Sequence, residues 1–579
     1  MKILLTTLHA KYSHASLALP GLAANCRSIR GVDVAIREWT VNEPAEQLLR
    51  LAMAEQADLV AFSCYIWNIE KSLRIASDIK KVSPGTLIAL GGPEASFGVF
   101  ELMRANPAVD FVIKGEGEGT FRQLVEILAS QKIRSSMVQP PPAPIPVPEG
   151  AFAEIGNLFS RDGDDIVAGP SSRAYLQLDS IPSPFEAGLV DLGKPQVYYE
   201  TSRGCPFSCA FCLSSVEGKV RSYSMDRIRN DLQFLMDRRV PSIKLVDRTF
   251  NYDAKRADRI WDFILEHNQG SHFHFEIAAD LLTRENISLL QRVPDKTFRF
   301  EIGVQSTSEG TLARVGRNSD LARCFDNIRR LRSETQVELH LDLIGGLPGE
   351  DYPGFLHSLQ RVADLNPHEI QIEPLKVLKG SPMRQIAQQE DYRFSAFPPY
   401  TILSTPWLSF AQICRIETIA RLLDLFHNRG GFANSLSFML RQMSFADLFD
   451  RMAGQIGVEN LSGFSTRRVY ELFARLAMGL VCDGEKHLLL DALFYDYCLH
   501  ELPQMGKLPD FIVGRHRECA WPGRRDLPPG VELAADSRVK LFRFTFLRDY
   551  RIEPWPDKPA GITFVYASKA GHGQSVTAV

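Results

Sequence analysis

The sequence predicts an α/β protein with a doubly wound parallel sheet, followed by a partial TIM-type βα barrel and a mostly helical C-terminal region. Short apolar runs alternate with helical patterns in two separate stretches of the chain, which is typical of parallel sheets covered by helices. A proline-rich segment separates these two stretches. At 579 residues the chain is also too long for one hydrophobic core, so we expect several domains.

The first series predicts a parallel sheet with helices on both faces. Its apolar runs have the length of strands, and they are followed by turns and by helical patterns such as residues 70–81. The predicted strands are 2–8, 32–38, 58–63, 86–90 and 109–113. Six prolines from Pro140 to Pro148 then predict an extended spacer. We expect a first domain over residues 1–130 and a linker with a connecting segment over residues 131–190.

The second series predicts an open or complete βα barrel over residues 191–400. Its predicted strands are 197–202, 242–247, 273–278, 297–304, 337–343 and 369–375. In barrels and open α/β sheets, chemistry collects at the C-terminal ends of the strands. Cys205 comes directly after the first of these strands.

The last region, residues 401–579, contains no catalytic motif. Helical patterns cover residues 413–426 and 469–480, and one strand of alternating aromatic residues covers 541–547. We expect this region to be a cap or packing domain.

Three clustered cysteines are the strongest indication of chemistry. Cys205, Cys209 and Cys212 have the spacing Cys-x3-Cys-x2-Cys, whereas the other seven of the ten cysteines are scattered singly. Three thiolates without a fourth ligand leave a metal position open. A zinc site is one reading, but zinc usually draws ligands from two separated pairs. The thiolate-rich set favours an iron-sulfur cluster.

Charge and hydropathy do not predict binding to nucleic acid or to a membrane. The 66 basic and 69 acidic residues are interspersed and give a formal net charge of −3, which does not predict binding to nucleic acid or anionic lipid. The apolar N-terminal run is too short for a signal peptide, and no run reaches the roughly 18 apolar residues of a membrane span. We expect a cytoplasmic protein.

The cysteine loop and the strands around it resemble the radical S-adenosylmethionine (SAM) superfamily. The resemblance implies that the three cysteines ligate a [4Fe-4S] cluster and that SAM chelates the fourth iron. It also implies that Phe211 packs beside the SAM adenine. The segment 300–306 resembles the fourth-strand segment of the family, and 342–350 resembles its glycine-rich turn. The SAM contacts implied by these two segments are Glu301, Gln305, Ser306 and Gly346.

The first domain is similar to cobalamin-binding domains. Ser63, then the pair Gly91 and Gly92, fall after the third and fourth predicted strands, where the nucleotide tail of cobalamin would lie. Gly115 and Glu116 begin a Gly-Glu-Gly-Glu turn after the fifth strand, which resembles cobalamin-type radical SAM enzymes. His9 falls where an axial cobalt ligand would, but the Asp and Gly of that loop motif are missing, so a hydrogen-bonding role is the alternative. A generic nucleotide-binding or flavodoxin-like fold is a second reading of this domain.

Together these resemblances imply a cobalamin-dependent radical SAM enzyme. It would cleave SAM reductively and methylate, or rearrange or cyclise, an unactivated carbon of an unknown small-molecule or natural-product substrate, using a one-electron reductant such as flavodoxin or ferredoxin. The C-terminal region resembles an uncharacterised extension of such proteins.

Two other functions remain as alternatives. The first is a methylthiotransferase-like enzyme, although that branch has three further cysteines in its first domain and this chain has only Cys26 and Cys64 there. The second is a non-enzymatic iron-sulfur protein for electron transfer or sensing.

Overall fold

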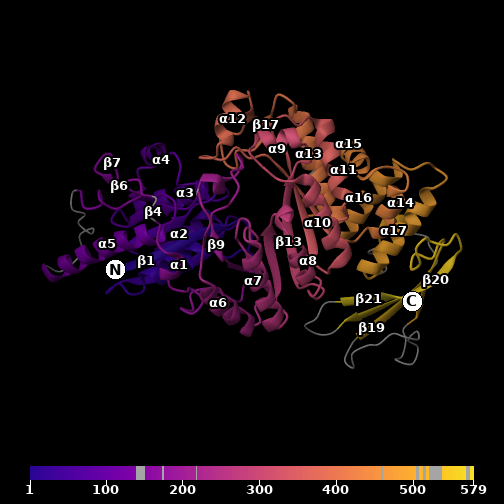
Figure 1. Ribbon diagram of the computed structural model, residues 1–579, viewed down its shortest axis with the longest axis horizontal. Coiled ribbons are helices and arrows are strands. Elements are labelled where there is room, and N and C mark those ends of the chain that lie inside the picture. Colours follow the sequence, from indigo (N-terminus) through magenta and orange to yellow (C-terminus); the bar gives the residue numbers. More distant parts are fainter. Residues whose placement is uncertain are drawn as a thin grey trace. The chain divides into compact units, whose positions relative to one another are not determined.

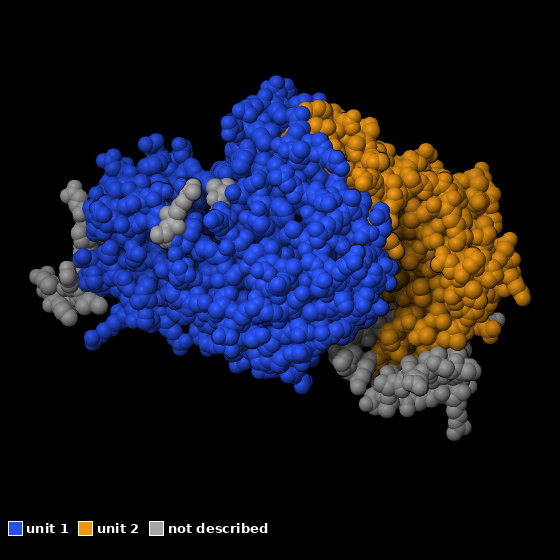
Figure 2. Space-filling model, viewed as in Figure 1, with its two compact units in different colours: residues 1–303, 309–339, 375–406 blue, residues 304–308, 340–374, 407–579 orange. Residues whose placement is uncertain are grey.

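The structure is a computed structural model of the full chain. It describes residues 1–138, 150–172, 175–216, 218–457, 461–503, 508–512, 517–520, 538–568 and 574–579, so the proline-rich spacer lies outside the described residues. The chain divides into two compact units, coloured in Figure 2. The first comprises residues 1–303, 309–339 and 375–406, and the second comprises 304–308, 340–374 and 407–579.

The N-terminal sheet has seven strands in the order β2-β1-β3-β4-β5-β6-β7. Their bounds are β1 (Lys2–His9), β2 (Asp33–Thr40), β3 (Leu59–Ser63), β4 (Leu87–Gly91), β5 (Phe111–Ile113), β6 (Leu158–Asp162) and β7 (Asp165–Ala168). The first five strands are parallel, as the sequence predicts. The antiparallel strands β6 and β7 extend the sheet from the connecting segment, where the sequence predicts no strand.

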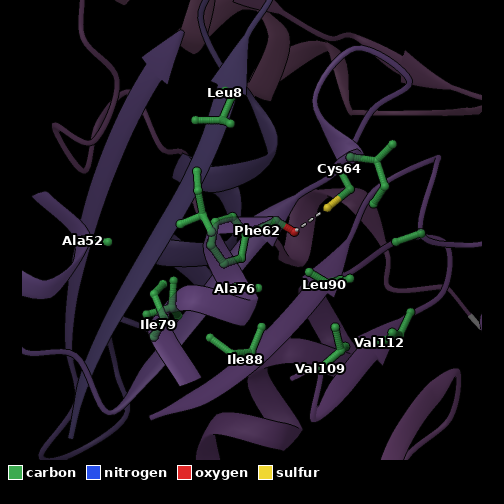
Figure 3. Close-up of a cluster of buried hydrophobic side chains, with 14 of the residues drawn as sticks. Leu8, Ala52, Phe62, Cys64, Ala76, Ile79, Ile88, Leu90, Val109 and Val112 are labelled. Carbon is green, nitrogen blue, oxygen red and sulfur yellow. Dashed lines mark hydrogen bonds between the residues drawn. The ribbon is translucent and has the colours of Figure 1, made fainter. Parts of the chain in front are cut away.

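Helices cover both faces of this sheet, which confirms the doubly wound fold (Figure 1). The helices are α1 (Ala18–Cys26), α2 (Ala45–Ala54), α3 (Ile69–Val82), α4 (Val99–Ala105) and α5 (Glu118–Val138). One core cluster joins the sheet to α2, α3 and α4, and a separate cluster joins it to α1 and α5. Figure 3 shows Phe62, Ile88 and Leu90 of the central strands beside Ile79 of α3. Because both of its faces are covered, the centre of the sheet is formed by the largely apolar strands β3, β4 and β5.

The strand order reverses between β1 and β3. The chain leaves β1 for α1 on one face and leaves β3 for α3 on the other. Loops that diverge in this way open a crevice at the C-terminal edge of the sheet, and ligands of doubly wound proteins bind there. The loops after β1, β3, β4 and β5 all lie at this edge.

The second sheet has six strands in the order β15-β14-β13-β12-β11-β8, so it forms an open, partial barrel. Their bounds are β8 (Val197–Tyr199), β11 (Ser242–Leu245), β12 (His272–Ile277), β13 (Phe298–Gln305), β14 (Glu338–Gly345) and β15 (Glu369–Pro374). The helices of this series are α6 (Met225–Asp237), α7 (Ala254–His267), α8 (Arg284–Leu290), α9 (Glu309–Arg314), α10 (Leu321–Glu334), α11 (Tyr352–Ala363) and α12 (Met383–Gln389). Short elements are β9 (Ser202–Arg203), β10 (Arg221–Ser222), β16 (Arg393–Phe394), β17 (Ile402–Ser404), η1 (Leu178–Ser180), η2 (Leu213–Val216) and η3 (Ala279–Leu281).

The barrel strands differ from those of the first sheet because only one of their faces is apolar. On β13, Phe298, Phe300 and Ile302 are buried, and the Phe300 ring stacks on Trp261 of α7 at 5.4 Å between ring centroids. The alternate residues, including Arg299 and Glu301, point to the opposite face of the strand. This alternation gives the inner face of the barrel a charged lining.

The C-terminal region combines helices with a small antiparallel sheet. The helices are α13 (Phe410–Leu423), its continuation η4 (Asp424–Asn428), α14 (Ala433–Leu440), α15 (Phe445–Gly454), α16 (Thr466–Met478), α17 (Lys486–His500) and η5 (Asp510–Ile512). The sheet has the order β18-β19-β20-β21, with β18 (Arg517–Ala520), β19 (Arg538–Phe546), β20 (Ala560–Ser568) and β21 (Gln574–Ala578). The predicted strand 541–547 corresponds to β19, and the other three strands of its sheet are additions to the mostly helical region that the sequence predicts. In the described part of the chain, no helix has the length and hydropathy to cross a membrane.

We expect Asp496→Asn to destabilise the C-terminal region. The fully buried Asp496 carboxylate accepts hydrogen bonds from the backbone N–H and Nδ2 of Asn434 and from the backbone N–H and Oγ of Ser435, at 2.6 to 3.1 Å. Asparagine would replace one acceptor oxygen with a donor, which should lower the free energy of unfolding by about 2 kcal/mol. Urea unfolding followed by circular dichroism measures this. Asp447→Asn, at an exposed ion pair with Arg451, is the control and should change little.

Candidate functional site

The cysteines lie on a loop whose two ends are paired. This loop runs from Gly204 to Val220, between β9 and β10, and Arg203 lies directly opposite Arg221 in the antiparallel register. Gly204 has φ +91°, and a Cβ on it would lie 2.9 Å from the carbonyl oxygen of Lys219. Only glycine therefore allows the chain to enter the cysteine loop from β9.

The structure surrounds two of the three thiols with polar partners. Cys205 Sγ is 3.4 Å from Oγ1 of Thr249, and Arg317 donates from Nη1 to Cys209 Sγ at 3.5 Å. Burial raises the pKa of the Cys209 thiol, and the positive charge of Arg317 opposes that shift. The Cys212 thiol is half-buried.

Zinc and an iron-sulfur cluster would use the three thiols differently. A single zinc ion would be bound by all three sulfurs at about 2.3 Å, whereas in a cluster each thiolate would bind a different iron. Within the described residues, no three His, Cys, Asp or Glu side chains converge on a single metal position.

The middle of the cysteine loop is held by the barrel segments of the first unit. The backbone N–H of Ala210 donates to the carbonyl of Val315, and the N–H of Met383 donates to the carbonyl of Ala210, each at 2.8 Å. Phe211, the expected adenine contact, follows Ala210 and is half-buried. These bonds fix the backbone at Ala210, directly after Cys209.

Glu301, an expected SAM contact, belongs to a charged cluster on the inner face of the barrel. Its Oε2 lies 2.9 Å from Lys244 Nζ and 2.7 Å from His274 Nε2, and Lys244 also pairs with Glu276 at 3.4 Å. Burial opposes ionisation of Glu301, but hydrogen bonds from His274 and Lys244 outweigh it and hold its pKa well below the usual range. Burial lowers the pKa of His274 to about 4, so its imidazole is neutral at pH 7.

The other three expected SAM contacts lie in the second unit. Gln305 ends β13 with φ +69°, a left-handed conformation that is unusual for a residue other than glycine. Ser306 is fully buried and donates from Oγ to Glu350 Oε1 at 2.6 Å. Glu350 closes the glycine-rich turn that contains Gly346, which has φ +96°. Ser306 is therefore bonded to the same turn as Gly346.

The expected cobalamin contacts after β3, β4 and β5 gather at one edge of the N-terminal sheet. Gly92 has φ +93°, and a Cβ on it would lie 2.7 Å from the carbonyl oxygen of Cys64, so this glycine lets the loops after β3 and β4 approach closely. At Gly91 and Gly115 an added Cβ would meet nothing within 4 Å. Ser96 joins the two glycine loops, because its Oγ donates to the Gly92 carbonyl and accepts from the Gly115 N–H.

This edge fits a large ligand that approaches the backbone. The open space beside Gly91 and Gly115 is what a cofactor lying along the loops requires. Ser63 ends β3 at the same edge and is buried, and its carbonyl accepts hydrogen bonds from Thr7 Oγ1 and Asn68 Nδ2. The residues present therefore fit cobalamin between the loops after β3, β4 and β5.

The structure gives His9 a protein partner. His9 is buried at the end of β1, and its Nε2 lies 3.1 Å from Oε2 of Glu38 on the neighbouring strand β2. The Glu38 carboxylate also accepts a hydrogen bond from the backbone N–H of Ser16. This geometry favours the hydrogen-bonding alternative over cobalt ligation, which stays a prediction.

Glu116, expected to contact cobalamin, is paired with two arginines of the cysteine loop. Its Oε2 lies 3.0 Å from Nη1 of Arg203, and its Oε1 bonds Nη2 of Arg221. Both carboxylate oxygens are thus engaged by the β9–β10 pair.

Sequence reasoning missed three residues at this site. Arg317 contacts Cys209 across 108 residues of chain, and no motif links the two. His14, in the loop after β1, lies with its ring centroid 6.3 Å from that of Tyr198 on β8. Burial, then the charges of His9, Lys11 and Lys244, lower the His14 pKa. His14 and Tyr198 therefore bring the edge of the N-terminal sheet close to the barrel strands, which no local pattern could have predicted.

Three family models match successive segments of the chain. The model described as B12 binding domain matches residues 3–125, and the model of the radical SAM superfamily matches residues 199–362. A third model, described as a protein of unknown function (DUF4080), matches residues 388–520. The chain therefore carries a B12-binding domain and a radical SAM domain, followed by a domain whose family has no assigned function.

Two curated relatives are methyltransferases by name. The cobalamin-dependent radical SAM methyltransferase TokK from Streptomyces tokunonensis is 24% identical over 67% of this chain and 59% of its own length. The 2-(S-pantetheinyl)-carbapenam-3-carboxylate methyltransferase of Streptantibioticus cattleyicolor is 23% identical over 77% of this chain and 66% of its own length. The chain thus spans about two thirds, or less, of these relatives.

Solved structures show the same fold. The radical SAM methyltransferase TsrM from Kitasatospora setae, solved with cobalamin and a [4Fe-4S] cluster bound, superposes with a TM-score of 0.57 at 14% identity, over 86% of this chain and 98% of that chain. The cobalamin-dependent SAM radical enzyme OxsB, solved with aqua-cobalamin and SAM, gives a TM-score of 0.55 at 15% identity, over 86% and 83% of the two chains. At these identities the likeness concerns the fold alone.

Two neighbouring glycines should respond differently to alanine. Gly92→Ala places a methyl group against the Cys64 backbone at a positive φ, so we expect a lower melting temperature. Gly91→Ala meets open space and should melt as the parent protein does. Differential scanning calorimetry of the cofactor-free chain makes the comparison, and equal melting temperatures for both variants would contradict the close approach of the two loops.

Proposed function

We propose that this protein, which carries a B12-binding domain and a radical SAM domain, is a cobalamin-dependent radical SAM enzyme that methylates an unactivated carbon. One observation carries the proposal: the loop with the three cysteines is joined directly to the glycine-lined edge of the B12-binding sheet, through Glu116, Arg203 and Arg221. A cluster on that loop and cobalamin at that edge would share one reaction space.

Cys205, Cys209 and Cys212 would each ligate one iron, and SAM would chelate the fourth. When bound, the reduced cluster supplies an electron that cleaves a carbon–sulfur bond of SAM, and methylcobalamin supplies a methyl group. Arg317 holds a positive charge beside Cys209 Sγ. That charge stabilises the thiolate form needed for ligation and favours the more negatively charged, reduced state of the cluster.

The inner face of the barrel would orient SAM. Glu301 is held ionised by Lys244 and His274, so its carboxylate can accept a hydrogen bond in a fixed direction. Phe211 would pack on the adenine, and Gln305, Ser306 and Gly346 would contribute at the ends of β13 and β14. Because Ser306 Oγ already donates a hydrogen bond to Glu350, we propose that Ser306 positions the turn that contains Gly346 and does not contact SAM itself.

Cobalamin would lie along the loops that contain Ser63, Gly91, Gly92 and Gly115. Gly91 and Gly115 would leave room for the ligand, and Gly92 would keep the loops after β3 and β4 together. We propose that His9 supports this edge through Glu38 and does not ligate cobalt.

The names of the two relatives described above support methyl transfer as the reaction, and cyclisation, which is in the names of two other relatives, is the alternative. We propose a small-molecule or natural-product substrate and a one-electron reductant such as flavodoxin or ferredoxin. Thiols that must stay reduced for cluster assembly favour the cytoplasm as the compartment.

Reductive cleavage of SAM tests the radical SAM assignment. The protein, reconstituted with iron and sulfide without oxygen, should form 5′-deoxyadenosine from SAM and dithionite, as measured by liquid chromatography. Cys209→Ala should reduce the product to background because one iron loses its ligand. The control is Cys482→Ala, at an exposed cysteine. A parent protein that yields no product would favour the electron-transfer or sensor alternative.

Retention of cobalamin tests the second cofactor. Anaerobic purification with hydroxocobalamin should give a coloured protein with about one cobalt per chain, because the fold has one such sheet edge. Gly91→Ala should melt like the parent but retain less cobalt, since its methyl group occupies the space assigned to the ligand. A colourless parent protein, or a Gly91→Ala variant that retains as much cobalt as the parent, would contradict the proposed cobalamin site.

A further inference from the structure

We infer that Glu116, Arg203 and Arg221 form an interdomain clamp that sets the separation between the cysteine loop and the B12-binding edge. The inference rests on the proposed function for the identity of the two cofactors. Glu116, Arg203 and Arg221 act as positioning residues, since their contacts are with one another and with the protein.

The clamp holds the cysteine loop by its base. Arg203 and Arg221 face each other across the β9–β10 pair, and every cysteine of the cluster motif lies between them. Arg203 is two residues before Cys205, so a displacement of its backbone moves the first thiol. The two arginines are therefore placed to control where the whole loop begins and ends.

A single carboxylate of the B12-binding domain engages both arginines. Glu116 presents Oε2 to Arg203 at 3.0 Å and Oε1 to Arg221. Arg203 also pairs with Glu118 at 2.7 Å and with Glu200 at 2.6 Å, and only 17% of its side chain is exposed. Burial opposes ionisation of Glu118, but Arg203 outweighs it and lowers the Glu118 pKa. Ion pairs with so little solvent around them are directional and weakly screened by salt.

The other end of the clamp is part of the proposed cobalamin site. Glu116 directly follows Gly115, which has φ +77° and open space at its Cβ position. Any shift of the Glu116 backbone therefore also moves the Gly115 backbone, against which cobalamin would lie. The clamp thus connects the cysteine loop directly to the loop that contains Gly115, beside which cobalamin would lie.

A second contact fastens the neighbouring glycine loop to the barrel part of the first unit. Glu94, two residues after Gly92, is buried and pairs through Oε1 with Lys379 Nζ at 2.9 Å, and it accepts a hydrogen bond from the Tyr400 hydroxyl. Because the loops after β4 and β5 are fastened at separate points, rotation of the B12-binding domain about the clamp is also resisted.

Two measurements on Glu116→Gln test the clamp. In the cofactor-free protein, we expect faster amide hydrogen exchange in peptides covering residues 205–212. The second measurement uses the protein loaded with cob(II)alamin and a reduced cluster. Electron paramagnetic resonance reports the magnetic interaction between these two centres. We expect this interaction to become weaker, or more widely distributed in strength, in the variant. The matched control is Glu46→Gln, which removes an exposed ion pair with Arg74 in the same domain and should leave both measurements unchanged.

Variants of Arg221 separate positioning from folding. Arg221→Lys keeps the charge that Glu116 requires and should retain the parental magnetic interaction, whereas Arg221→Met should reproduce the effect of Glu116→Gln. If the parent protein binds both cofactors and its electron paramagnetic resonance spectrum is the same as that of Glu116→Gln, the proposed clamp is wrong. A parent that binds neither cofactor contradicts the proposed function instead.

Discussion

The pairing of Glu116 with Arg203 and Arg221 is the contact on which the candidate site depends. Each sheet presents its reactive loops at the C-terminal edge of its own strands, and nothing within one sheet determines where the other edge lies. The carboxylate of Glu116 meets the base of the cysteine loop at a direct, largely buried ion pair. Through this contact the loop with the thiols and the loop with the open glycine become parts of one site.

The two sheets differ in which faces of their strands are apolar, and this difference decides where each sheet can hold a ligand. The central strands β3, β4 and β5 of the N-terminal sheet are apolar on both faces, so a ligand is expected at their end loops. The barrel strands alternate, with aromatic residues against the helices and Lys244, His274 and Glu301 on the inner face. Mutual hydrogen bonds and ion pairs stabilise this charged face, and they also fix the direction of each side chain.

Two residues that the motifs predict to contact a cofactor have side chains that contact other protein groups in the structure. Glu116 belongs to a turn that resembles a cobalamin site, yet its carboxylate is engaged by arginines. Ser306 belongs to a segment that resembles a SAM site, yet its hydroxyl is engaged by Glu350. In both cases the side chain supports the loop that carries the motif. Sequence motifs identify a local backbone geometry more reliably than the partner of each side chain.

The parallel strands of both series, the cysteine loop and the glycine turns can be predicted from sequence alone, because strand periodicity, thiol spacing and turn chemistry are local properties. The sequence could not predict that β6 and β7 extend the first sheet or that β18, β20 and β21 accompany β19, because edge strands and short antiparallel strands carry weak periodicity. The contacts of Arg317 with Cys209 and of Glu116 with Arg203 were decided only by the tertiary structure. They join residues far apart in the chain, and a charged side chain takes whichever partner the fold brings within a few ångströms.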